Sequence, residues 1–170
     1  MVNKEVQDAI NEQIKAEFYA AYQYLGMMTY FEEMSLGGFA TWMRLQAEEE
    51  VSHAMRLLDF LLDRGGKVEL QAIDEPTSGF TSPLEVMRAA LAHEQKVTGM
   101  INDLYELAVE HKDYPAQVLM QWYISEQVEE EKNAGDIVDQ LEFVGESPSA
   151  LLVIDERLGQ RTAEEEEEGA

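Results

Sequence analysis

Four stretches of this chain each carry an apolar stripe whose members are spaced alternately by three and four residues. Such spacing is typical of the buried face of a helix in a bundle. Polar side chains that can ligate metal ions interrupt every stripe near its middle. No Lys or Arg stands on a stripe, so the inward carboxylates lack a cationic partner unless a metal ion provides one. The interrupting residues are Glu17 in the first stripe, Glu50 and His53 in the second, Glu94 in the third, and Gln127 and Glu130 in the fourth.

The interruptions are in register with one another. Glu94 lies 77 residues after Glu17, and Gln127 lies 77 residues after Glu50. The chain therefore reads as two helical hairpins in tandem, a weak internal repeat of structure. Within each hairpin the polar residues are nearly equidistant from the turn, so at about 1.5 Å per residue the facing side chains come level to within a few ångströms. We predict one cluster of ligands at one depth of a helical bundle.

The connection between the second and third helices decides the topology. Short connections at Ser35–Gly38 and near Lys112 make the two helices of each hairpin antiparallel. The longer connection, from Gly65 to Ser82, extends at up to about 3.3–3.6 Å per residue. It can therefore run the length of a helix of about 28 residues, roughly 42 Å. We predict an all-α four-helix bundle with one long crossover and parallel second and third helices.

Local signals mark the ends of these helices. Gly65-Gly66 is a C-cap signal, and Ser82-Pro83-Leu84-Glu85 is a capping box with proline at the first helical position. The segment Ala150–Leu158 is too apolar for a free end, and it either packs on its own bundle or lies at a subunit interface. We predict a single bundle with a short fifth helix over residues 1–159. Residues 160–170, which include the acidic run Glu164–Glu168, are predicted to be a disordered tail.

Composition narrows the classes of function. A chain of 170 residues with 45% hydrophobic content fits one compact domain. The net charge of −23 argues against binding to nucleic acid or to anionic membranes. It favours attraction of cations, although simple solubility also accounts for it. The absence of cysteine and of an apolar signal segment in Met1–Gln13 predicts a soluble, cytoplasmic protein without disulfides.

The spacing of the polar residues favours a paired metal site. Glu50 and His53 stand at i and i+3, on one helical face and close enough to share a metal ion. Glu17 completes one set of three ligands, and Glu94 with Glu130 can form a second set that Glu50 bridges. Oxygen-rich ligation with one imidazole suits iron(II) or manganese(II) better than a closed zinc site. A lone Glu-x-x-His is a weak signal, but aligned ligands on four stripes are a strong one.

From about Asn11 to Leu158 the chain resembles the non-haem ferritins of bacteria and archaea. The resemblance rests on NEQIKAEFYAAYQYL, which ends at Leu25, on AEEEVSHAMRLLDFL, on HEQ at residues 93–95, and on QWYISEQVEEEKNAGDIVDQL. It implies a ferritin-like bundle in which the cluster is a di-iron ferroxidase centre. In that centre one iron would be held by Glu17, Glu50 and His53, the other by Glu50, Glu94 and Glu130, with Gln127 as an outer amide.

The resemblance also implies a third, weaker iron site and a tyrosine beside the centre. The third site corresponds to Glu49, Glu126 and Glu129 together with Glu130. Three of these residues stand at i, i+3 and i+4 on one helical face, which supports a site but also fits a solvated acidic face. Tyr24 matches the tyrosine, and an ordinary core tyrosine is the alternative.

Departures from related families limit the chemistry that we expect. The second hairpin has Gln127-x-x-Glu130 where rubrerythrins and bacterioferritins carry a second Glu-x-x-His. Bacterioferritins place a haem-ligating methionine directly after the glutamate of the first motif, and this chain has Val51 there, so we expect no haem. His93 and His111 lie off the stripes and are predicted to be surface residues.

We therefore expect iron storage and detoxification. Iron(II) would be oxidised by dioxygen or peroxide and deposited as an iron(III) mineral inside a homo-oligomeric shell, for which the resemblance implies 24 subunits. Two alternatives stay open. One is a soluble di-iron carboxylate oxidase or peroxidase without storage, for which Ala21, Ala90 and Ala134 leave room for an organic substrate. The other is a non-catalytic helical assembly protein that binds divalent cations.

Overall fold

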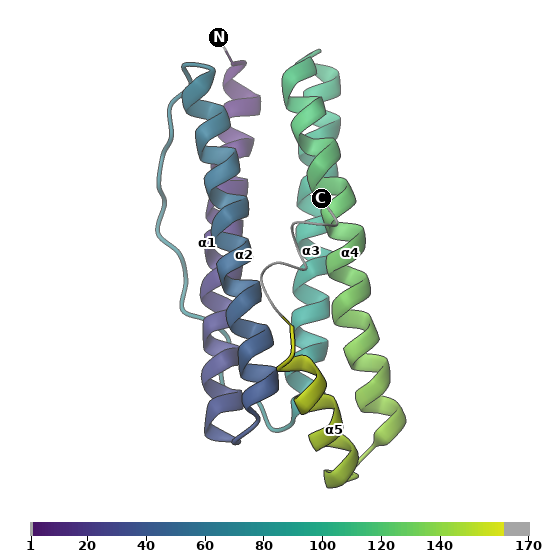
Figure 1. The fold of residues 1–170 in the computed structure, drawn as a ribbon. Coiled ribbons are helices and arrows are strands. Elements are labelled where there is room, and N and C mark those ends of the chain that lie inside the picture. Colours follow the sequence, from purple (N-terminus) through teal and green to yellow (C-terminus); the bar gives the residue numbers. More distant parts are fainter. Residues whose placement is uncertain (1, 162–170) are drawn as a thin grey trace.

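A computed structural model describes residues 2–161 of the chain. Within this range α1 and α2 lie side by side, as do α3 and α4, and together they form a four-helix bundle (Figure 1). A short α5 lies at the end of the bundle where α4 finishes. These features confirm the predicted all-α fold with a short fifth helix. The helices are α1 (Lys4–Glu33), α2 (Gly37–Asp63), α3 (Pro83–Glu110), α4 (Tyr114–Val144) and α5 (Pro148–Leu158).

The predicted cap signals act at both ends of the crossover. The α2 helix is followed by Gly65, whose φ of +67° gives the left-handed backbone that closes a helix. At the start of α3, Ser82 Oγ accepts a hydrogen bond from the Glu85 backbone N–H at 3.2 Å. The Glu85 carboxylate turns back to the backbone N–H and hydroxyl of Thr81, both at 2.7 Å, and so completes the cap one residue earlier than the standard capping box.

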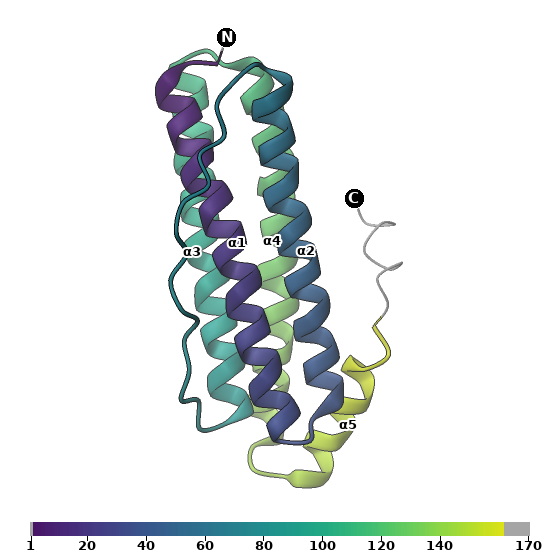
Figure 2. The same ribbon diagram turned by 90° about the vertical axis from the view of Figure 1, so that its left-hand side faces the viewer.

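The crossover runs the length of the bundle beside α1, so that α2 and α3 are parallel as predicted (Figure 2). Amide side chains of α1 fix its path at three heights, because each accepts a hydrogen bond from a crossover backbone N–H. These bonds join Gln7 to Lys67 at 2.8 Å, Asn11 to Glu69 at 2.7 Å, and Gln23 to Thr77 at 2.8 Å. The long connection is therefore held against α1 by hydrogen bonds along its length.

The first turn of α2 depends on α5. The N-cap residue Leu36 makes no side-chain bond to the helix, and Asp155 of α5 takes that role by accepting from the Phe39 N–H at 2.9 Å. Gly38 permits this close approach, because a Cβ there would lie 1.6 Å from the Asp155 carbonyl oxygen. The sequence prediction was wrong in placing Gly37 and Gly38 in the preceding turn, since both belong to α2.

The sequence left open whether α5 packs on its own bundle or lies at a subunit interface, and the two faces of α5 differ in this respect. Ile154 and Leu158 are buried against the bundle, whereas Leu152 and Val153 are 60% and 66% exposed. The helix is thus anchored to its own bundle by one face and presents a second apolar face outward.

The apolar core is split by a layer of buried polar side chains. One apolar cluster lies near the α1–α2 turn and includes Phe31, Phe39 and Trp42. The other lies toward the opposite end and includes Ile10 and Leu104. The polar layer between them contains the predicted ligands, and each of its members is at most 4% exposed: Glu17, Gln46, Glu50, His53, Glu94, Gln127 and Glu130.

The predicted stripes form the core with small exceptions at their ends. The stripe members Met28, Phe60 and Val144 are half-buried, and Met27 and Leu61 lie fully inside in place of Met28 and Phe60. A helix with 3.6 residues per turn does not match a strict seven-residue repeat, so the buried face drifts slowly around each helix relative to the predicted stripe.

No helix within residues 2–161 is both long and apolar enough to cross a membrane. The acidic run predicted as a disordered tail, Glu164–Glu168, lies outside the described residues.

Candidate metal centre

Three ligand residues of the first hairpin converge in the polar layer. Glu17 from α1 and Glu50 and His53 from α2 each offer a ligand atom, and these atoms lie within 4.8 Å of one another. Glu50 Oε2 lies 3.5 Å from His53 Nδ1. The structure thus brings together the first predicted set, two carboxylates and one imidazole, in a site shielded from water.

Neighbouring side chains hold this set in place. Gln13, one turn before Glu17 on α1, donates from Nε2 to Glu17 Oε1 at 2.7 Å. The Tyr123 hydroxyl of α4 donates to the backbone carbonyl oxygen of His53 at 2.6 Å. These bonds orient the ligands from outside the group, as is usual around metal sites.

Burial favours the protonated form of the two carboxyls in the first set when no cation is bound. It raises the pKa of Glu17 to about 7, against hydrogen bonds from Glu50 and Gln13 that lower it. Burial also raises the pKa of Glu50 well above its ordinary value, and the charges of nearby carboxylates add to the effect. The two carboxyls share a hydrogen bond and hence a proton. A divalent cation would replace that proton, because metal ligation requires the ionised form.

The imidazole of His53 is held in its ligating form. Burial lowers its pKa to about 4, and the positive charge of Arg56 contributes in the same direction. The ring is therefore neutral at pH 7, with a lone pair available for a metal ion.

The residues of the second hairpin lie in the same layer but are occupied by hydrogen bonds. Glu94 accepts from the Tyr24 hydroxyl at Oε1 and from Gln127 Nε2 at Oε2, the latter at 3.2 Å. Glu130 Oε2 accepts from Gln46 Nε2 at 2.7 Å. Among the described residues, neither glutamate joins a group of three ligand atoms within 4.8 Å. Burial nevertheless raises the pKa of both carboxyls, so they too favour a proton or a cation.

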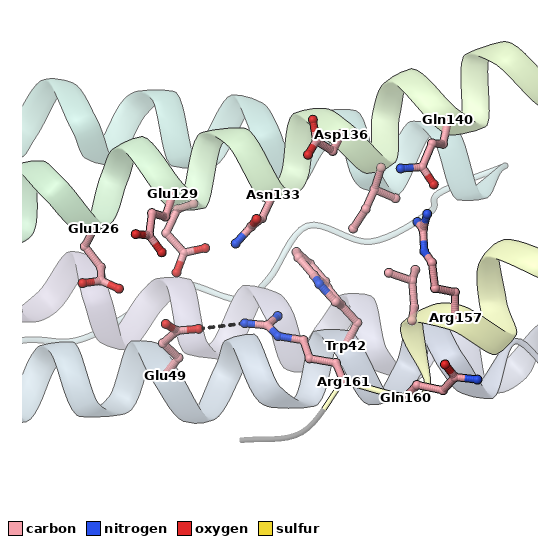
Figure 3. A pocket seen from close by; sticks show the side chains of 13 residues that line it. Trp42, Glu49, Glu126, Glu129, Asn133, Asp136, Gln140, Arg157, Gln160 and Arg161 are labelled. Atoms are coloured by element: carbon pink, nitrogen blue, oxygen red, sulfur yellow. Dashed lines mark hydrogen bonds and ion pairs between the residues drawn. The ribbon is translucent and has the colours of Figure 1, made fainter. Parts of the chain in front are cut away.

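A second group of converging ligands lies beside the first. It consists of Glu49, His53 and Glu126, whose ligand atoms are also within 4.8 Å of one another. The resemblance pointed to Glu129 and Glu130 in place of His53. Those two glutamates line the same cavity of about 550 Å³ between α2 and α4 (Figure 3). All four acidic residues thus border one cavity, and two of them, Glu49 and Glu126, also converge with His53.

Sequence reasoning missed Gln13, Gln46 and Arg161. A signal for the glutamines was present, because each stands one turn before a glutamate of the first hairpin. No signal placed Arg161, which follows α5 and reaches the edge of the cluster from outside the stripes. Its guanidinium donates to Gln46 Oε1 and lies 3.3 Å from a Glu49 carboxylate oxygen.

The prediction that His93 and His111 are surface residues was wrong, because both are half-buried. His93 packs against the Tyr19 ring, with 5.7 Å between centroids, and burial lowers its pKa to about 4. His111 is held between Asn3 and Glu5 at the start of α1.

Two aromatic residues pack against the imidazole of His53. The Trp122 and Tyr123 ring centroids lie 5.3 and 6.0 Å from that of His53, and the Arg56 guanidinium covers the Trp122 ring at 3.6 Å. This side of the site is therefore closed by aromatic rings packed edge to face.

Comparison with known proteins agrees with this geometry. A model of the ferritin-like domain matches residues 7–144. Bacterial non-haem ferritins from Bacteroides fragilis and Campylobacter jejuni are 38% and 40% identical to the chain. The first match covers 95% of this chain and all of that protein, and the second covers 92% and 93%.

Solved structures give the same result. An open-pore ferritin from the hyperthermophilic archaeon Archaeoglobus fulgidus superposes with a TM-score of 0.94 at 44% identity, over 95% of this chain and 100% of that one. A form of the same ferritin engineered to be closed gives the same TM-score and identity, over 95% and 99% of the two chains. With a matching family model, close relatives and a carboxylate–imidazole cluster inside the bundle, this chain belongs to the ferritin family.

Proposed function

We propose that this protein oxidises iron(II) at the buried cluster and stores the resulting iron(III). The observation that carries the proposal is the convergence of Glu17, Glu50 and His53 on one point inside a ferritin-family bundle. Two carboxylates and a neutral imidazole form a ligand set suited to iron(II), and they leave coordination positions open for the oxidant.

The second hairpin would complete the di-iron centre. Glu94 and Glu130 lie in the same buried layer, and their charges raise the pKa of Glu50. We infer that both carboxylates exchange their present hydrogen bonds for a second iron ion, which Glu50 bridges to the first. Two iron(II) ions would then give one electron each to dioxygen, which takes up two protons and leaves as hydrogen peroxide.

Storage requires a compartment for the product. The Archaeoglobus relative is an open-pore ferritin, and we propose that this chain assembles into a homo-oligomeric shell of 24 subunits in the cytoplasm. The acidic cavity that contains Glu49, Glu126 and Glu129 would hold a third, weaker iron position on the way from the centre to the mineral.

The oxidation step is tested by replacing the bridging residue. We expect Glu50→Ala to slow the oxidation of two iron(II) ions per chain by at least about 100-fold, because outer residues of metal sites alone affect function by about 10–100-fold. Stopped-flow absorbance after mixing with aerated buffer measures this rate. Sedimentation velocity checks that the variant assembles like the wild type.

The matched control is Glu48→Ala on the same helix. Glu48 is exposed, so its replacement removes the same charge without touching the layer. It should leave the rate within about twofold, as for surface substitutions in general. Oxidation at the wild-type rate in Glu50→Ala would refute the bridging role.

A further inference from the structure

The chain segment after α5 carries a cationic side chain into the acidic cavity. Arg161 lies between α2 and α4 and points toward Glu49 (Figure 3). Its Nη2 is 3.3 Å from a Glu49 oxygen, and the side chains of this pair are only 16% and 12% exposed. The guanidinium also lies 5.4 Å from the centroid of the Trp42 ring. The contact is thus a partly buried ion pair flanked by an aromatic ring.

Arg161 also fixes the orientation of a buried amide. Its Nη1 donates to Gln46 Oε1, and because a guanidinium has only donors, it must face the oxygen of that amide. The nitrogen of Gln46 is therefore directed at Glu130, to which it donates at 2.7 Å. Gln46 thus links the charge at the cavity wall to one oxygen of Glu130, a carboxylate of the proposed di-iron centre.

The position of Arg161 follows from the docking of α5. Asp155 caps the start of α2, and the carbonyl oxygen of Asp155 fits against Gly38 with no room for a Cβ. Ile154 and Leu158 are buried against the bundle. The last turn of α5 is therefore anchored three residues before Arg161.

We propose that Arg161 and a divalent cation compete for Glu49, so that the end of α5 gates the acidic cavity. This inference rests on the third iron position proposed above. A divalent cation at Glu49 takes the carboxylate that the guanidinium contacts, and the two positive charges repel one another. The cation therefore displaces Arg161. Gln46 then loses the donor that fixes its amide, and Glu130 is released to turn toward the metal.

The test uses Zn²⁺, which binds carboxylate and imidazole ligands and has no redox chemistry. Titration calorimetry on the assembled full chain separates tightly bound ions from a weaker class. A Trp122→Phe background leaves Trp42 as the single tryptophan, so its emission reports the position of Arg161. In this background we expect Arg161→Ala to bind the weaker class about tenfold more tightly, a difference of about 1.4 kcal/mol. The Trp42 emission should change over the same zinc range in the parent and not in Arg161→Ala.

Two further variants identify the cause. Arg157→Ala removes an equal charge from the same cavity wall. Its zinc affinity for the weaker class of sites should stay within about twofold of the parent, as for other surface changes. Glu49→Gln should abolish the difference between the parent and Arg161→Ala, because it removes the group for which both cations compete.

Three results would overturn the gate. Equal weaker-class affinities in the parent and Arg161→Ala would show that there is no competition. An equal gain in zinc affinity in Arg157→Ala would show that the overall charge of the cavity, and not the contact between Arg161 and Glu49, sets the affinity. Absence of a weaker class in every variant would eliminate the third iron position together with the gate, whereas the tight ions and the oxidation test with Glu50→Ala would stand independently.

Discussion

The two hairpins bring their ligands to the same layer in different states. In the first, Glu17, Glu50 and His53 already converge within 4.8 Å. In the second, Glu94 and Glu130 are held by donors from a tyrosine and from amides. Both oxygens of Glu94 accept such bonds, so Glu94 must exchange at least one of them before it ligates a metal ion. One half of the proposed centre is therefore ready for a cation, whereas the other half must first exchange hydrogen bonds.

Part of the difference originates in one position of the internal repeat. Gln127 lies 77 residues after Glu50 and takes the corresponding place on α4. An amide nitrogen donates where a carboxylate ligates, and Gln127 directs its donor at Glu94, with contacts of 3.1 Å to the backbone oxygen and 3.2 Å to the carboxylate. The amide thereby organises the second half of the centre before a metal ion arrives.

The largest expected effect separates the two halves by removing one ligand from each. Glu17→Gln should lower the affinity for the first, most tightly bound iron(II) ion by at least about 100-fold, because it breaks the convergent set. Glu94→Gln should leave that affinity within about threefold of the wild type and lower only the affinity for the second ion. Anaerobic iron(II) calorimetry measures both steps. Equal losses of the tightest ion in the two variants would contradict the asymmetry.

A second test uses the pH dependence of stability in the metal-free protein. Burial raises the pKa of Glu17 from its ordinary value of 4.5 to about 7, so the folded state holds this proton more tightly than the unfolded state. The resulting stabilisation is complete below pH 4.5 and is lost as the pH rises to about 7. It amounts to at most on the order of 3 kcal/mol, because one pKa unit corresponds to about 1.4 kcal/mol.

The variant Glu17→Gln isolates this contribution. The lowered pKa of His53 acts in the opposite sense, since its stabilisation is lost as the pH falls from 6.5 toward 4, but it is present in both proteins. Urea unfolding between pH 4.5 and 8 should show that the wild type loses stability relative to Glu17→Gln as the pH rises. Parallel curves for the two proteins would show that the Glu17 carboxyl is ionised in the fold.

The smallest expected effects come from a matched pair of tyrosines. Tyr24 donates to the Glu94 carboxylate, and Tyr123 donates to the backbone oxygen of His53. Each change to Phe should cost about 1 kcal/mol of unfolding free energy, the usual net value of one hydrogen bond. Only Tyr24→Phe should change the affinity of the second iron(II) ion, because only the Tyr24 hydroxyl donates to a ligand carboxylate of the second hairpin. A change of that affinity in Tyr123→Phe alone would reverse our assignment of the two halves.

The architecture and the ligand layer were predictable from the sequence because both depend on helical periodicity. The interrupted stripes placed Glu17, Glu50, His53, Glu94 and Glu130 inside, and all of them are buried. The long crossover was predictable from the number of residues between the second and third helices. The grouping of residues into iron sites stays a prediction, because it depends on where the side chains turn when a metal ion binds.

What the sequence missed depends on contacts between distant segments. Gly37 and Gly38 read as turn residues, yet they open α2 because Asp155 caps that helix from α5. Arg161 was invisible as a partner of Gln46, since no local pattern encodes how α5 docks. Half-burial of His93 likewise results from the Tyr19 ring on a neighbouring helix. Tertiary contacts of this kind override local signals.

Sedimentation velocity after aerobic loading with excess iron(II) distinguishes iron storage from simple iron oxidation. Protein and iron absorbance are followed together in one run. For a storage protein, we expect iron far beyond a few ions per chain to travel with one large, uniform protein particle. If the protein carries only a pair of ions per chain while the remaining iron sediments separately, the buried centre would belong to a di-iron oxidase, and the storage function would be contradicted.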